Sequence, residues 1–282
     1  MREGRASITA QRVAERRAAH QVFDIPKVFD DPVALAIIGN EAAAQIRAEP
    51  ARAQTPVSRG LRAFMAVRSR YAEDQLGEAV RRGVTQYVIL GAGLDTFAYR
   101  NPHPELRVFE VDHPATQAWK RSRLEAASIP VPASLTFTPV NFERETFEQG
   151  LAQRGFDAGR AAFFSWLGVT PYLRREIVLN TFERIAALCP QNGVAFDYAI
   201  PRDSLGLLQR IAFDTIANRV AAAGEPFVSF FKADELMSEL CRVNFRHIED
   251  LDTEQINARY FQDRKDGLQI GGGMAHLMCA HG

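Results

Sequence analysis

Apolar residues are spaced as in amphipathic helices over roughly the first eighty positions of the chain. Breaks fall at Asp30-Asp31-Pro32 and at Glu49-Pro50, where proline disfavours continuation of a helix. We therefore expect three helical segments before the first strand, over 8–22, 32–47 and 57–82. Together they predict a helical cap that spans residues 1–82.

Short apolar runs then alternate with helical segments as far as residue 200. The expected strands cover 84–90, 106–112, 135–140, 161–165 and 193–199. The expected helices between them cover 113–127, 143–153 and 174–188. Alternation of strand and helix is typical of an α/β protein with a doubly wound, mostly parallel sheet. Residues 83–200 are the predicted cofactor-binding core of that sheet.

The rhythm changes after Pro201. Helical patterns over 204–223 and 233–241 predict a helical lid spanning 201–242, because an insertion late in such a sheet is well placed to cover a substrate. Terminal strands are expected within 243–282, over 244–248 and 269–278, with a helical piece at 252–260 between them. They would complete seven strands in one domain, 1–282, as an antiparallel pair at the sheet edge, with a kink or bulge at Gly271-Gly272-Gly273.

The first expected strand ends at Gly91-Ala92-Gly93, with Thr96 at the third position of a G-x-G-x-x-G pattern. Two glycines let the backbone turn tightly and approach a ligand that a Cβ would exclude. The next strand ends in Glu110 and Asp112, roughly 20 residues later, where a carboxylate can bind ribose hydroxyls. The two signals together predict a nucleotide-cofactor site with Asp112 on the ribose and Glu110 as a supporting acceptor.

Charge and composition narrow the class of partner and the compartment. The 34 basic and 34 acidic residues leave no net basic field for nucleic acid, so a small molecule is the expected partner. Three widely spaced cysteines fit neither a disulfide framework nor a zinc site, and no metal is expected. The sequence has no long uncharged apolar run, so we expect neither a secretion signal nor a membrane span. The cytoplasm is therefore the default compartment.

Other expected strand ends and the cap offer further ligand contacts. Asn141 can exchange hydrogen bonds with an adenine amino group while Phe142 covers the base, although a helix-capping role for Asn141 fits equally well. Arg68 and Arg70 could neutralise a carboxylate over the glycine loop, or they could lie on a solvated helix face.

These residues resemble the leucine carboxyl methyltransferase-like family of S-adenosylmethionine-dependent O-methyltransferases, in particular its bacterial small-molecule and polyketide branch. The resemblance spans nearly the whole chain. The segments that carry it are Arg17-Ala18-Ala19-His20-Gln21, Phe29-Asp30-Asp31-Pro32, Arg68-Ser69-Arg70-Tyr71-Ala72-Glu73-Asp74, Leu90-Gly91-Ala92-Gly93-Leu94-Asp95-Thr96, Tyr99-Arg100 and Phe109-Glu110-Val111-Asp112-His113-Pro114.

The resemblance implies a role for each candidate residue. Gly91 and Gly93 would pass under the methionine part of S-adenosylmethionine, and Asp112 would bind its ribose. Asn141 and Phe142 would flank the adenine. Arg68 would bind the cofactor carboxylate, with Arg70 as second choice, and the region from Arg17 onward would fold over the cofactor.

Two positions depart from the family pattern. Leu167 stands before Gly168 where relatives commonly carry an acid that contacts the cofactor ammonium, and we expect backbone carbonyls such as those of Gly91 or Ser165 to replace it. Phe97 stands where many bacterial members place an arginine within the loop helix, and its expected effect is on local packing.

The expected activity is O-methylation of a small-molecule carboxylate or acidic hydroxyl. No residue is assigned as catalytic, because none of the candidate bases has a neighbour in sequence that marks it as activated; they are His20, His113, Tyr172, Asp197 and Tyr198. An NAD-dependent oxidoreductase would use the same strand, glycine turn and acid, although Thr96 and the long helical cap argue against it. A non-catalytic S-adenosylmethionine-binding protein is the other alternative, motivated only by Leu167.

Overall fold

The computed structural model describes residues 8–141, 144–222 and 224–282 of the chain. Its sheet has seven strands in the order β3-β2-β1-β4-β5-β7-β6, and β7 runs antiparallel to both β5 and β6. The strands are β1 Gln86–Leu90, β2 Arg107–Asp112, β3 Leu135–Pro139, β4 Ala162–Trp166, β5 Gly193–Ala199, β6 His247–Leu251 and β7 Ala275–His281. The prediction of a doubly wound, mostly parallel sheet with an antiparallel strand pair at its edge is confirmed.

Burial explains why the central strands are mostly apolar. Every residue of β1, β4 and β5 is buried, as expected for parallel strands covered on both faces. The strand order reverses between β1 and β4, since β1 is followed by β2 on one side while β4 begins the other half. Ligands of open α/β sheets bind outside the carboxyl ends of the strands at such a switch point.

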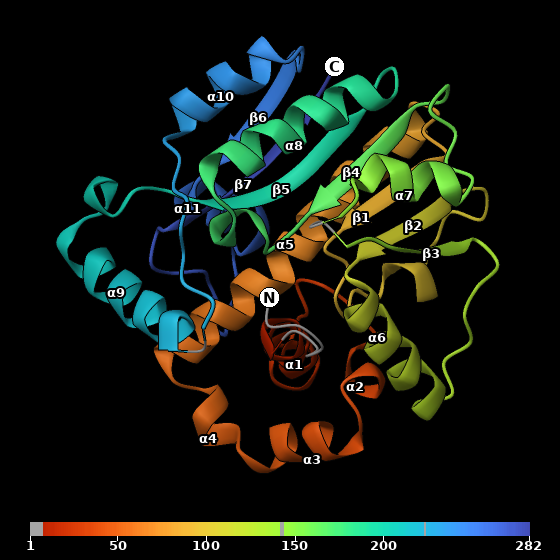
Figure 1. Ribbon diagram of the computed structural model, residues 1–282. Helices are drawn as coiled ribbons and strands as arrows, with labels where there is room; N and C mark the ends of the chain where they lie inside the picture. The colour runs from red at the N-terminus through yellow and green to blue at the C-terminus, as the bar shows by residue number, and fades with distance from the viewer. Residues whose placement is uncertain (1–7, 142–143, 223) are drawn as a thin grey trace.

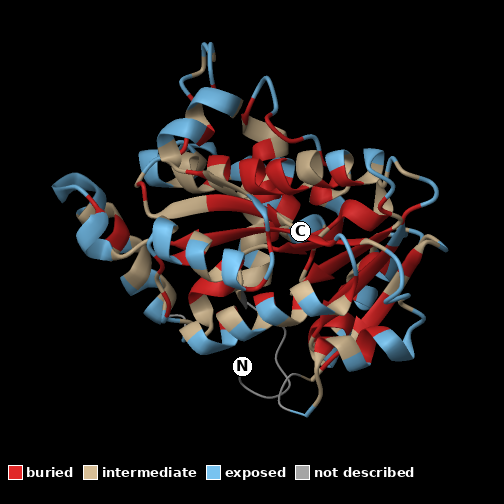
Figure 2. Cartoon of the chain, turned by 90° about the horizontal axis from the view of Figure 1, so that it is seen from above, coloured by how far each residue is buried: buried red, intermediate tan, exposed pale blue. Residues whose placement is uncertain are grey.

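Helices cover both faces of the sheet (Figure 1). One apolar cluster joins the sheet to α5, α6 and α11, and a second joins it to α7, α8 and α10. The helices are α1 Ile8–Phe23, α2 Ala34–Ile37, α3 Asn40–Ala48, α4 Pro50–Ala53, α5 Pro56–Arg81, α6 Pro114–Ala126, α7 Phe147–Gln153, α8 Arg175–Leu188, α9 Leu207–Ala222, α10 Ala233–Arg242 and α11 Thr253–Tyr260. Figure 2 shows the buried sheet between helices whose outer surfaces are exposed.

The helical cap forms largely as its apolar spacing predicts. The long helix α5 begins where Thr55 accepts a hydrogen bond from the Ser58 amide and Pro56 takes the first helical position. The single helix predicted over 32–47 is wrong: Gly39, with φ +87°, separates α2 from α3. A positive φ strongly favours glycine and cannot continue a right-handed helix.

Several other predicted limits also need correction. The helix predicted from residue 143 begins only at Phe147, where Thr146 and Gln149 form a capping box. A single 3₁₀ turn, Phe97–Tyr99, follows the glycine loop where a helix was expected. The first terminal strand starts at His247 and not at residue 244, because Asn244 (φ +74°) lies in the turn after α10.

The other terminal strand was also misplaced. It begins at Ala275 rather than at residue 269, and the triple glycine forms a bend ahead of it instead of a bulge within it. Gly272 and Gly273 have positive φ there, which a strand does not accommodate.

The predicted lid region contains two helices with different surroundings. α10 packs beside α8, whereas α9 extends to one side of the sheet in Figure 1 and has Phe213 as its buried residue. The division into cap, core, lid and terminal strands stays a prediction.

Candidate cofactor and acceptor site

The glycine loop leaves β1 at the switch point of the sheet. Gly91 has φ +70° and Gly93 φ +47°, the left-handed region that L residues with a Cβ rarely adopt. A Cβ at Gly91 would lie 2.6 Å from Val169 Cγ2, and one at Gly93 would lie 3.2 Å from Cβ of Ala10 in α1. Both glycines are therefore required by the turn and by the close approach of neighbouring segments.

Asp112 lies at the carboxyl end of β2, directly beside this loop. Its Oδ2 accepts the Gly93 amide at 2.6 Å and its Oδ1 accepts the His113 amide at 2.7 Å. Burial raises the pKa of Asp112 above its usual range, and these two amides oppose the rise. Each oxygen keeps a further lone pair, so the carboxylate can still accept ribose hydroxyls. The predicted role of Asp112 fits this geometry and stays a prediction.

Glu110 points to the same side of β2 but lies deeper in the protein. It is fully buried and paired with Lys120 Nζ at 2.7 Å, and that ammonium also donates to the Asp95 carbonyl of the loop. Burial raises the pKa of Glu110 to about 7, although Lys120 opposes the rise. Glu110 therefore supports the loop through Lys120.

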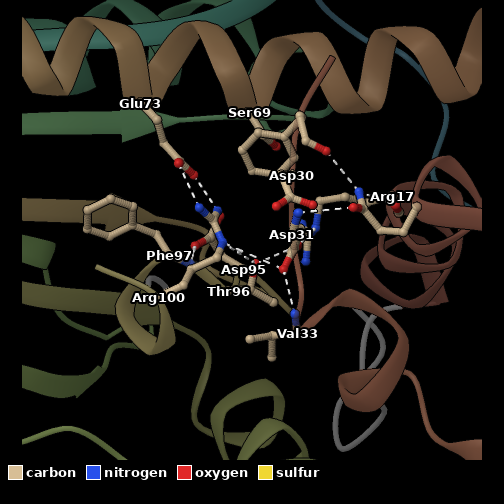
Figure 3. Close-up of polar contacts among 12 residues, drawn as sticks. Arg17, Asp30, Asp31, Val33, Ser69, Glu73, Asp95, Thr96, Phe97 and Arg100 are labelled. Carbon is tan, nitrogen blue, oxygen red and sulfur yellow. Dashed lines mark hydrogen bonds and ion pairs between the residues drawn. The ribbon is translucent and has the colours of Figure 1, made fainter. Parts of the chain in front are cut away.

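A buried ion-pair network fastens the helical cap to the glycine loop (Figure 3). Arg17 of α1 donates to Asp31 at 2.8 Å and to the Leu94 carbonyl at 2.6 Å. Thr96 donates its hydroxyl to the same Asp31 oxygen at 2.7 Å. Thr96 therefore stands at the third glycine position because its hydroxyl joins the loop to the cap.

Arg100 extends this network to α5. It pairs with Asp31 at 3.6 Å and binds both carboxylate oxygens of Glu73. Its guanidinium also lies 4.7 Å from the Phe29 ring centroid. The sequence motifs contained these residues, but no sequence signal indicated which ones pair. The expectation that the region around Arg17 folds against the loop agrees with this arrangement.

Arg68 reaches the carboxyl ends of β4 and β5 from α5. It pairs with Asp197 at 3.2 Å, and Asp197 also accepts the Gly168 amide at 2.5 Å. A Cβ at Gly168 would lie 2.8 Å from the guanidinium nitrogens, so the glycine makes room for Arg68. Arg70 instead forms a half-exposed pair with Asp74. Of the two arginines, only Arg68 is buried at the strand ends.

A carboxylate, that of Asp197, lies beside Gly168, the residue that follows Leu167, where the family pattern has an acid. It projects from the neighbouring strand, β5, and lies against the backbone of Gly168. Sequence reasoning considered Asp197 only as a base, because a residue one strand away gives no sequence signal of its contact with Gly168. A contact of the cofactor ammonium with the carbonyls of Gly91 or Ser165 stays a prediction.

Of the two predicted adenine neighbours, the structure describes Asn141. The backbone amide of Asn141 donates to the Glu145 side chain at 3.1 Å, and its backbone carbonyl accepts the backbone amides of Arg144 and Glu145. Asn141 therefore begins the turn that leads toward α7. Phe142 lies outside the described residues. Their contacts with adenine stay predictions.

The candidate bases separate into structural residues and site residues. His20 is fully buried; its Nδ1 bonds Asp24 at 2.8 Å and its Nε2 accepts the Val28 amide at 3.0 Å. His113 caps α6 by accepting the Ala115 amide. Tyr198 donates to Asp250 from the opposite face of β5. These three side chains form structural hydrogen bonds away from Arg68. The other two candidate bases, Tyr172 and Asp197, lie near Arg68.

Tyr172 borders the site after β4. Burial raises the pKa of Tyr172 to about 12, with Arg68 opposing the rise, so the phenol stays protonated at neutral pH. Its ring packs on Phe227 at a centroid distance of 5.4 Å, and Phe227 in turn faces Phe213 of α9 at 6.5 Å. These aromatic residues form a wall between the strand ends and the lid.

The described residues fit a nucleotide cofactor with an amino-acid tail. Positive-φ glycines beside a buried carboxylate suit a ribose, and Arg68 with Asp197 offers both charges that an α-amino acid needs. A cavity of about 410 Å³ lies instead at the other end of the strands, near Arg82 and His281. That position is wrong for the cofactor, which binds at carboxyl ends in this fold class. None of the described helices is long and apolar enough to cross a membrane.

Comparison with solved structures defines the class of fold. The chain is similar to a structure from Thermobifida fusca named as a methyltransferase, with a TM-score of 0.60 at 17% identity, covering 99% of this chain and 96% of that one. It is also similar to a DUF574 family protein from Streptomyces avermitilis, with a TM-score of 0.56 at 14% identity, covering 94% and 96%. The fold is that of Rossmann-like methyltransferases.

Sequence comparison narrows this class to a family. The sequence model of the leucine carboxyl methyltransferase family matches residues 10–186. A Bacillus subtilis (strain 168) relative, YktD, which carries the name of an S-adenosyl-L-methionine-dependent methyltransferase, is 33% identical over 95% of both chains. A similarly named Mycobacteroides abscessus protein is 34% identical over 63% of this chain and 59% of its own.

The chain belongs to the leucine carboxyl methyltransferase family of S-adenosylmethionine-dependent methyltransferases. Its cofactor is therefore S-adenosylmethionine, and the prediction of both family and cofactor is confirmed. The same result removes the alternative of an NAD-dependent oxidoreductase.

Proposed function

We propose that this protein is an O-methyltransferase whose acceptor is a small-molecule carboxylate or an acidic hydroxyl. We also propose that it is a cytoplasmic enzyme of secondary metabolism. One observation carries the proposal: the described groups at the strand ends include no free base. Asp197 is committed to Arg68 and Gly168, and Tyr172 is protonated at neutral pH. An acceptor oxygen at this site must therefore arrive already ionised or close to it.

The chain's own residues position the reactants and exclude water. When bound, S-adenosylmethionine supplies an electrophilic methyl group: the acceptor oxygen forms the new O–C bond, the C–S bond breaks, and its electron pair stays on sulfur. Arg68 and Asp197 would orient the amino-acid tail, and Asp112 would orient the ribose. α1 and the aromatic wall would keep water away, and such positioning is the main requirement for an in-line transfer. A carboxylate acceptor releases no proton, so no base is needed.

The pH dependence of methyl transfer tests this proposal. Single-turnover rates with carboxylate and phenol acceptors should be measured from about pH 6 to 9, since single turnover separates chemistry from product release. A carboxylate acceptor should give a nearly flat profile. A steep rise that disappears in Tyr172→Phe or Asp197→Asn would identify a base and contradict the proposal. Absence of transfer to any acid or phenol would instead support the non-catalytic alternative.

A further inference from the structure

Helix α1 presents two functional faces. Ala10, Ala14 and Arg17 follow one another at helical spacing on one face. Arg17 binds the Leu94 carbonyl of the glycine loop, and Ala10 lies where a Cβ on Gly93 would approach it to 3.2 Å. Thr9, Arg12 and Arg16 share another face. Thr9 donates its hydroxyl to Glu225, which follows α9, so this second face points toward the lid.

Arg16 lies half-buried on the lid side without a carboxylate partner. Its guanidinium donates only to the Arg12 carbonyl, at 3.4 Å, and no ion pair joins Arg12, Arg16 or Arg219 to any residue that the structure describes. Burial lowers the pKa of Arg16, and the like charges of Arg219, Arg12 and Arg68 lower it further. The positive charges of Arg12 on α1 and Arg219 on α9 therefore both act on Arg16.

The acids near these arginines each have another hydrogen-bond donor, although the charge of Arg12 also acts on Glu225. Glu15 accepts from Gln11 at 2.8 Å, Glu225 accepts from Thr9, and Asp197 pairs with Arg68. Burying a cation without a counter-charge is costly, and an arginine guanidinium matches a carboxylate with two parallel hydrogen bonds. We call Arg12, Arg16 and Arg219 the arginine group. Arg12 and Arg219 are exposed and Arg16 is half-buried, so Arg16 is the member of the group best placed to bind the carboxylate of a ligand.

The aromatic wall adjoins the arginine group. Thr9, on the same face of α1 as Arg16, binds Glu225, and Glu225 lies two residues before Phe227 of the wall. Phe230 continues the wall, 5.8 Å from Phe213 of α9, the helix that also carries Arg219. A cationic group beside stacked rings suits a ligand with a planar apolar body and a negative group at one end.

We propose that the methyl acceptor is an aromatic carboxylate, whose negative group is bound by Arg16 within the arginine group and whose ring lies on the wall of Tyr172, Phe227 and Phe213. This inference rests on the proposed function for the word acceptor, but the binding itself can be tested alone. Arg16 is a specificity-determining residue in this arrangement, whereas Arg68 and Asp197 serve the cofactor.

Calorimetric titration with 2-naphthoate and with its neutral amide tests the binding. The full chain is titrated with and without S-adenosylhomocysteine. We expect the naphthoate to bind, and we expect the affinity of the amide to be at least about tenfold lower. Arg16→Gln should weaken naphthoate by about tenfold or more, and Arg16→Lys by less, because lysine keeps the charge but loses the bidentate geometry.

The control variant is Arg242→Gln, which removes an exposed arginine on α10, away from α1 in Figure 1. It should bind naphthoate like the wild type. Arg16→Gln should bind S-adenosylhomocysteine normally and keep its thermal midpoint, because Arg16 forms no ion pair with the part of the chain that the structure describes. Lower thermal stability of this variant would indicate a structural role.

Four results would overturn the inference: no binding of naphthoate to the wild type, equal binding of naphthoate and amide, equal binding by Arg16→Gln, or loss of S-adenosylhomocysteine instead of naphthoate. The last would assign Arg16 to the cofactor. Failure of the proposed function looks different, since Arg16-dependent naphthoate binding would persist while no carboxylate is methylated.

Discussion

Asp31→Asn tests the buried network that joins the cap to the glycine loop. The Asp31 side chain is fully buried and is the acceptor for Arg17, for the Thr96 hydroxyl and for the Val33 amide. Asparagine keeps the size of the side chain but removes its charge. Arg100 retains Glu73, whereas Arg17, which is 4% exposed, would lose the negative charge of Asp31 and keep neutral acceptors such as the Leu94 carbonyl.

Breaking a buried pair in this way costs about 3–5 kcal/mol, because one charge is left uncompensated. We expect a loss near the lower value, about 3 kcal/mol, since Leu94 still accepts from Arg17. Urea denaturation measures the free energy of unfolding. The neighbouring Asp30→Asn is the matched control: Asp30 is exposed and pairs only with Lys27, so its loss should stay within about 1 kcal/mol.

A double-mutant cycle makes the test sharper. Arg17→Met removes the lone cation, so adding it to Asp31→Asn should cost less than the sum of the two single changes. Additive losses, or a loss in Asp31→Asn no larger than in Asp30→Asn, would refute the view that this pair fastens α1 to the loop.

Three further predictions concern the cofactor loop. Gly93→Val should abolish S-adenosylhomocysteine binding in a protein that stays folded by circular dichroism, because a β-branched residue resists φ +47° and would press on Ala10; normal binding would show that the loop is not the cofactor site. Asp112→Asn should weaken that binding by about 1.5–3 kcal/mol in calorimetry and Glu110→Gln by less, and the reverse order would exchange their roles. The pKa of Glu110 rises from 4.5 to about 7 on folding, so between these values the folded state keeps a proton that the unfolded chain releases. The free energy of unfolding, measured by urea titration, should therefore decrease as the pH is raised from about 4.5 to about 7. Glu110→Gln should lose this pH dependence, and its persistence would assign the effect to another group.

The sheet could be predicted because its strands are defined by local sequence. β1, β4 and β5 are buried and mostly apolar, and the spacing between the glycine loop and Asp112 reflects a single connection from β1 to β2 that contains one 3₁₀ turn. The terminal strands were harder to place. Asn244 and the triple glycine adopt positive φ in turns, and an apolar pattern that continues across a turn does not show where pairing begins.

Site residues could be predicted only where they belong to a local sequence motif. Gly91, Gly93 and Asp112 belong to such a motif. Asp197 does not, because its importance arises from Gly168 and Arg68, which approach it from β4 and α5. Pairings between distant segments depend on tertiary packing, and a single sequence carries no direct record of them.

Helix α1 joins the two halves of the proposed reaction. Its Arg17 face is fastened to the cofactor loop by buried hydrogen bonds, whereas its Arg16 face meets the lid through Thr9 and Glu225. A displacement of α1 would therefore disturb the glycine loop and the arginine group together. Methyl transfer requires both reactants to be aligned and shielded from water, and in the arrangement that we propose one helix, α1, contacts both the cofactor loop and the acceptor site. Arg16 agrees with this proposal, because no ion pair joins it to any residue that the structure describes and a ligand carboxylate could accept its hydrogen bonds.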